Sequence, residues 1–83
     1  MEVRKMKRSK YYEYCNSASI VFLSAESAKH QNVLDWRMLQ SYLRHLKEIT
    51  ERAEKDPEVI DDMFFINYEM ELYANKIIEL YEE

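Results

Sequence analysis

Glycine is absent from this sequence of 83 residues, and Pro57 is the single proline. Average usage would give about 7% glycine, or roughly six residues. Glycine is the usual residue of tight hairpin turns and of loops that bring the backbone close to a phosphate group. Its absence argues against a β-hairpin protein, a dinucleotide-binding fold and a P-loop, so we expect a helical protein.

Cysteine and long hydrophobic runs are also scarce. Cys15 is the only cysteine, which excludes an intrachain disulfide and favours a reducing compartment. No run of 18 apolar residues occurs, so the sequence predicts no membrane span. The basic N-terminal run is not followed by the apolar segment and cleavage site of a signal peptide. We therefore expect a cytoplasmic protein.

Motifs for catalysis or metal binding are missing as well. His30 and His45 lie on different predicted helices, and there is no His-Glu-x-x-His pattern and no cysteine pair. Without glycine there is no Gly-x-Ser-x-Gly nucleophile turn. Cys15 falls on an apolar helix face, which favours a small packed side chain over a nucleophile. We expect no enzyme, no metal, no cofactor and no small-molecule substrate.

The residues that are present suit one helical domain over residues 1–83. The chain is 47% hydrophobic and 13% aromatic, which is enough apolar material for a core. A first helix is predicted from Ser9, as N-cap, to His30, although the apolar run Ile20–Leu23 could instead form a short strand. One face of this helix carries small and aromatic residues: Tyr11, Cys15, Ala18, Phe22 and Ala25.

The second and third helices have clearer patterns. The second is expected to begin at Val33 or Asp35, with Asn32 or Asp35 as its cap, and to end at Lys55. Its apolar stripe repeats at intervals of three and four: Trp36, Leu39, Leu43, Leu46, Thr50 and Ala53. The third is expected to run from Asp56 as N-cap, with Pro57 at the first helical position, to Tyr81. Its heptad seam is Val59, Met63, Ile66, Met70, Tyr73, Ile77 and Leu80.

Short connections between long amphipathic helices favour antiparallel neighbours. The sequence therefore predicts an all-α, up-down-up three-helix bundle. The alternative is a hairpin of the second and third helices that dimerises into a four-helix core, with the first helix packed outside.

The third predicted helix has a second apolar stripe. Phe65, Tyr68 and Leu72 are spaced i, i+3, i+7 on a face rotated away from the seam, and Phe64 widens it. A second stripe needs a second partner, which could be another helix of the bundle, a second copy of the chain or a foreign protein. Glu69 and Glu71 would form its charged rim.

Charge is unevenly distributed along the chain, whose net charge is −4. Residues 1–10 carry a net +4, with residues 1–8 as a basic N-terminal arm, and residues 57–83 carry a net −7. The arm could lie against the acidic helix of the same chain or of a twin. It could also bind nucleic acid, next to the following tyrosines, through Arg4, Lys5, Lys7, Arg8 and Lys10. The acidic helix could alternatively imitate nucleic acid.

These features favour a small non-enzymatic protein-interaction module that binds and regulates or inhibits a larger protein. Short helical chains of this kind are frequent among regulators from phages and mobile elements, and this chain could itself act as a homodimer. The predicted contact residues are Phe65, Tyr68, Leu72, Glu69 and Glu71. Association with nucleic acid through the basic arm is the alternative.

Overall fold

The protein is a bundle of three long helices in its computed structural model, which describes the backbone of residues 2–82 and the side chains of residues 10–82. The elements are α1 (Glu2–His30), α2 (Trp36–Glu54), the short 3-10 helix η1 (Ile60–Asp62) and α3 (Met63–Glu82). Residues 2–82 contain no strand, and Ile20–Leu23 lie within α1, so the strand alternative for this run is wrong.

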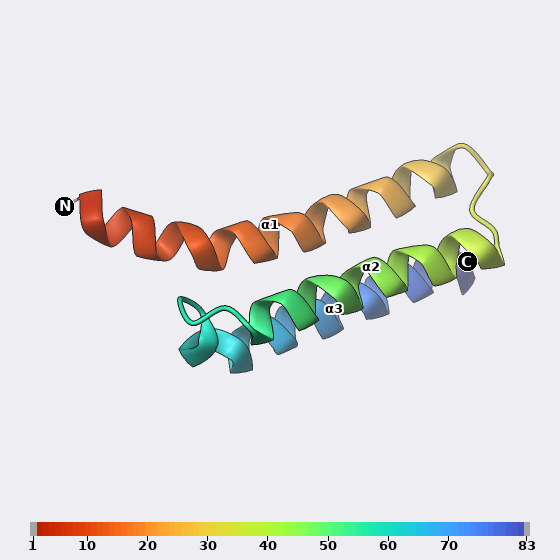
Figure 1. The fold of residues 1–83 in the computed structure, drawn as a ribbon. Helices are drawn as coiled ribbons and strands as arrows, with labels where there is room; N and C mark the ends of the chain where they lie inside the picture. The colour runs from red at the N-terminus through yellow and green to blue at the C-terminus, as the bar shows by residue number, and fades with distance from the viewer. Residues whose placement is uncertain (1, 83) are drawn as a thin grey trace.

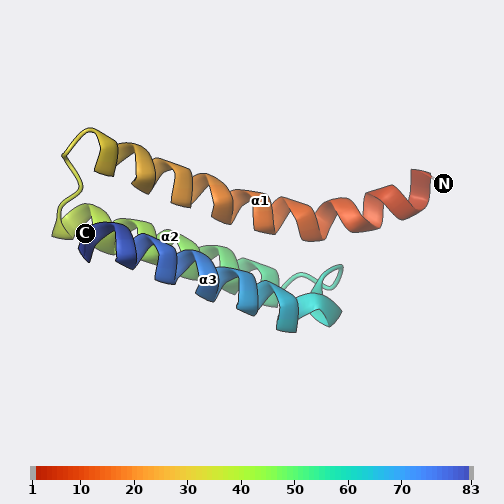
Figure 2. The same cartoon turned by 180° about the vertical axis from the view of Figure 1, so that it is seen from behind.

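The helices follow the predicted up-down-up order. Figure 1 shows α2 running back along α1, and α3 returning beside α2 in the direction of α1. Every pair of helices is in contact, and the molecule measures 45 × 22 × 15 Å along its principal axes. The N-terminal end of α1 projects beyond the loop between α2 and α3 in both views (Figures 1 and 2). The predicted three-helix bundle is therefore confirmed.

The core is built from small side chains on α1 and larger ones on α2 and α3. Ala18 and Ala25 of α1 have no exposed surface. Because their side chains are small, this helix can approach its neighbours closely. The other two helices and the connection between them contribute fully or almost fully buried apolar side chains, which are Leu39, Leu46, Ile49, Val59, Ile66, Met70 and Ile77. Trp36 does not join them: it is 58% exposed and packs its ring against Tyr81, with 6.0 Å between centroids.

The first helix is longer than predicted. It begins at Glu2, so Ser9 lies inside α1 and is not an N-cap. Residues 2–8 continue this helix instead of forming a separate arm. The helix continues because nothing in the run from Glu2 to Ser9 breaks it: the run has neither glycine nor proline, and Arg and Lys are good helix formers.

Asn32 ends α1 by taking the role that glycine usually has. Its φ of 59° is in the left-handed region, where asparagine is tolerated better than most residues. The N–H of Val33 donates to the carbonyl of Ala28 at 3.0 Å, and the N–H of Asn32 donates to that of Lys29 at 3.0 Å. This pair of bonds is a Schellman motif. Of the two predicted caps of α2, Asn32 and Asp35, the structure shows Asp35, whose carboxylate accepts from the N–H of Met38 at 2.8 Å.

The third helix begins later than predicted. Asp56 is not its N-cap and Pro57 does not open it, because residues 57–59 form a turn and η1 precedes Met63. The carboxylate of Asp56 accepts from the N–H of Glu58 at 2.9 Å, which stabilises this turn. The turn carries Val59 into the core, where it has no exposed surface. Val59 is therefore buried where the backbone forms a turn and a 3-10 helix, which is wound more tightly than an α-helix.

Candidate protein-interaction surface

One side of α3 faces the core as the heptad pattern predicts. Ile66 and Ile77 have no exposed surface, and Met70 is 6% exposed. Met63, Tyr73, Ala74 and Leu80 are partly buried against this seam. The predicted seam is therefore confirmed, and it leaves the opposite side of α3 without a partner inside the bundle.

The opposite side of α3 exposes four large apolar side chains, which we call the α3 outer surface. Phe64 is 76% exposed, Phe65 57%, Tyr68 58% and Leu72 39%. The rings of Phe64 and Phe65 meet edge to face, with centroids 5.4 Å apart. Neither α1 nor α2 covers this second stripe, so packing within the bundle does not provide the second partner that the stripe needs.

Acidic side chains surround the α3 outer surface. Asp61 precedes this surface in η1, and at 100° per residue Glu71 lies beside Phe64 on α3; both acids are exposed. Lys76, the only cation of residues 57–83, instead approaches the rings of Phe22 and Tyr73, at 5.6 and 5.8 Å from their centroids. The surface is thus apolar at its centre and negative at its edges.

Glu69 lies on the side of α3 that faces α1. It is half-buried, and its charge helps to raise the pKa values of Tyr11 and Cys15. Burial is the main cause for both residues, and it raises the pKa of Tyr11 to about 12. A half-buried thiol with a raised pKa is a poor nucleophile, which agrees with a packing role for Cys15.

A polar cluster joins α1 to the connection between α2 and α3. The hydroxyl of Tyr14 donates to Asp56 at 2.7 Å, and the Lys10 ammonium lies 3.5 Å from the same carboxylate. The hydrogen bond from Tyr14 is the main reason that the pKa of Asp56 is lowered, and Asp56 is the main reason that the pKa of Lys10 is raised. Sequence reasoning missed this cluster, although it singled out Asp56 as a helix cap.

The nucleic-acid alternative depends on five basic residues, of which the structure describes one side chain. Lys10 is engaged with Asp56 and lies 3.8 Å from Glu13. The side chains of the other four lie outside the described part of the structure, namely Arg4, Lys5, Lys7 and Arg8. The described side chains therefore place one of the five cations in contacts within the chain.

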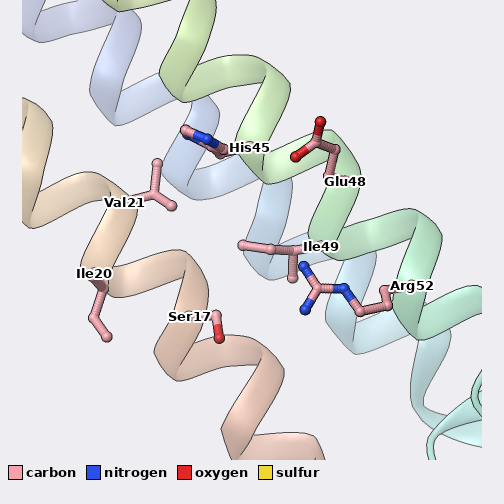
Figure 3. A pocket seen from close by; sticks show the side chains of 7 residues that line it. All are labelled: Ser17, Ile20, Val21, His45, Glu48, Ile49 and Arg52. Atoms are coloured by element: carbon pink, nitrogen blue, oxygen red, sulfur yellow. The ribbon is translucent and has the colours of Figure 1, made fainter.

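An open pocket of about 230 Å³ lies between α1 and α2. Figure 3 shows Ser17, Ile20 and Val21 on α1, opposite four residues of α2: His45, Glu48, Ile49 and Arg52. His45 is exposed. It lies on α2, whereas His30 lies on α1, so the two histidines are on different helices as predicted. Among the described residues, no group of three His, Cys, Asp or Glu side chains could hold a metal ion.

Two further findings bear on function. Within residues 2–82, none of the helices combines the length and the hydrophobicity needed to cross a membrane. No protein-family model, no curated protein and no solved structure matches this chain. Its function is therefore inferred from the surfaces described above.

Proposed function

We propose that this protein is a non-enzymatic interaction module that binds and regulates or inhibits a larger protein through the α3 outer surface. The observation that supports this most strongly is the exposure of Phe64, Phe65, Tyr68 and Leu72 together on one helix face. Exposed apolar residues scattered singly are normal, but a contiguous row with a polar rim is typical of a binding surface. We also propose a cytoplasmic location, on the basis of the single cysteine.

The spacing of these residues fits the packing of a helix against a groove or another helix. Phe65, Tyr68 and Leu72 are anchors at i, i+3 and i+7, which is the pattern of helix-in-groove recognition. Aromatic anchors at the centre of an interface contribute most of its binding energy, and a charged rim contributes less. We expect Phe65 and Tyr68 to contribute most of the binding energy. We expect Glu71 to help orient the partner on the surface.

The charge at the edges of the surface indicates the chemistry of the partner. Asp61 and Glu71 would be left facing like charges on an acidic partner, so a partner with basic residues beside its apolar stripe fits best. Such binding would weaken as the salt concentration rises, because dissolved ions screen the attraction between exposed charges. At 0.1 M salt this attraction decays over a distance of about 10 Å. An apolar contact alone would not weaken in this way.

The test compares the capture of a partner by the unaltered chain and by two variants. The double substitution Phe65→Ala and Tyr68→Ala should lower the affinity for the partner at least tenfold, because the two anchors together should contribute more than about 1.4 kcal/mol. The matched control is Tyr12→Ala with Val33→Ala, outside the α3 outer surface, whose side chains are 57% and 51% exposed. This control should bind the partner normally.

A designed peptide helix gives a second measurement that does not require the natural partner. Peptides with leucines at i, i+3 and i+7 should bind when lysines flank the stripe, and should not bind when glutamates flank it. Equal binding of both peptides would refute the role of the acidic rim. Unchanged capture by the Phe65 and Tyr68 double variant would refute the assignment of the surface itself.

A further inference from the structure

A second exposed row of side chains runs along α1, and we call it the α1 outer surface. It consists of Asn16, Ile20, Leu23 and Ser27, all exposed. Ile20 is 54% exposed and Leu23 is 56% exposed. The intervals of four, three and four residues are those of a coiled-coil seam, in which one helix packs along another. This surface lies on a different helix from the α3 outer surface.

The α1 outer surface differs from the α3 outer surface in charge. Between Tyr14 and Ala28, Glu26 is the only charged residue, and it is half-buried. The exposed residues that flank the seam here are Ser17 and Ser24, which are small and uncharged. Two copies of this surface can therefore meet without bringing like charges together, and their small flanks allow close approach.

The spacing of the α1 outer surface is also self-complementary. If two α1 helices pack antiparallel about a two-fold axis between Ile20 and Leu23, then Ile20 of one copy lies opposite Leu23 of the other. Asn16 then lies opposite Ser27, so that polar residues meet polar residues at both ends. An interface made by the same patch on both subunits has this property. Both the charge and the spacing of the α1 outer surface therefore favour a second copy of this chain as its partner.

The pocket between α1 and α2 adjoins this surface. Ile20 belongs to the seam and also lines the pocket, with Val21 next to it and Ile49 across on α2 (Figure 3). A side chain from a second copy near the axis would find a recess beside Ile20, whose α2 wall combines Ile49 with the polar side chains of His45, Glu48 and Arg52. We infer that the α1 outer surface is the interface at which two copies of this chain form an antiparallel homodimer.

A homodimer through the α3 outer surface fits less well. A parallel pairing of two α3 outer surfaces would place Glu71 of each copy close to Glu71 of the other, and like charges that face each other oppose association. The α3 outer surface therefore stays open for a foreign partner in the α1-paired dimer. The inference does not depend on the proposed function, because the two surfaces lie on different helices.

The experiment measures the mass of the native chain in solution by light scattering or sedimentation. The unaltered protein should show twice the chain mass of 10.2 kDa at high concentration. Ile20→Glu with Leu23→Glu should reduce it to one chain mass, because four carboxylates would meet at the apolar seam. Phe65→Glu with Tyr68→Glu, at equally exposed positions, should remain a dimer.

Helix content by circular dichroism shows that each variant is folded, which is expected because all four positions are more than half exposed. Raising the salt concentration should leave the dimer intact, since no ion pair contributes to it. A chain mass of 10.2 kDa for the unaltered protein at all concentrations would overturn the inference and leave the proposed function standing. A dimer lost through the α3 variant alone would overturn both.

Discussion

Tyr14 and Asp56, which are 42 residues apart in the sequence, are joined by a hydrogen bond of 2.7 Å from the tyrosine hydroxyl to the carboxylate. Tyr14 is 8% exposed, so its ring packs in the core while its hydroxyl reaches the edge. This contact ties α1 to the connection between α2 and α3. The same carboxylate also holds the turn before η1 through the N–H of Glu58.

Replacing Tyr14 with phenylalanine should destabilise the fold without changing its shape. The ring would still fill its place in the core, but Asp56 would lose its hydrogen bond. Loss of one such bond should lower the melting temperature by roughly 4–8 °C in a domain of this size. The matched control is Tyr12→Phe on the exposed side of α1, which should leave the melting temperature unchanged. Equal melting temperatures for the two variants would contradict the structural importance of the contact.

Asp56 should make stability fall in acid. Its pKa is lowered in the folded protein, so the unfolded chain takes up the proton first as the pH falls. The stabilising contribution is therefore complete above the ordinary aspartate pKa of 3.8 and is lost as the pH falls through the lower folded value. The free energy of unfolding can be measured by urea denaturation at neutral pH and at a pH below 3.8. Its decrease between these two pH values should be smaller for Asp56→Asn than for the unaltered chain. Asp61→Asn, at an exposed position, is the control and should retain the full acid dependence.

The left-handed conformation of Asn32 predicts how this position responds to substitution. Glycine should be tolerated within about 0.5 kcal/mol of the unfolding free energy, because it adopts a φ of 59° without steric cost. Valine should lower the unfolding free energy by about 1–2 kcal/mol, because its branched side chain clashes in this region. Asn32 is exposed, so chemical denaturation of the two variants reports on the backbone and not on packing. A valine variant as stable as the glycine variant would argue against the Schellman motif.

Truncation of the neighbours Phe65 and Ile66 should change the unfolding free energy by very different amounts. Ile66 has no exposed surface, and Ile66→Ala should lower the unfolding free energy by about 2–5 kcal/mol. Phe65 is 57% exposed, and Phe65→Ala should change it by less than about 0.5 kcal/mol. If Ile66→Ala fails to fold, Ile66→Val should still show a loss of about 0.5–1.5 kcal/mol. A large loss for Phe65→Ala would indicate that the α3 outer surface is packed within the protein.

Periodicity predicted the faces of the helices more successfully than their ends. The buried positions Ile66, Met70 and Ile77 follow from the heptad spacing, because a helix places residues three and four apart on one side. The same reasoning separated Phe65 and Tyr68 from the seam, and the structure leaves both exposed. Face assignment needs only the repeat of the helix, which the sequence carries within a few turns.

Helix ends depended on contacts that no local pattern contains. Asp56 followed by Pro57 is a strong start signal, yet α3 begins at Met63. The carboxylate of Asp56 is engaged by Tyr14 from another helix, and Val59 is drawn into the core. Both contacts join residues that are close only after the helices have packed. They therefore could not be predicted from the start signal alone.

The sequence by itself determined that this protein is helical, because a chain without glycine lacks the usual residues of hairpin turns while its apolar residues repeat at the period of a helix. It also determined that α3 has more apolar surface than one seam requires. Only the tertiary structure decided which surfaces stay exposed. α1 packs against the core through the small side chains of Ala18 and Ala25 and covers its remaining side. Phe65 and Tyr68 therefore face outward, and no helix of the bundle covers them.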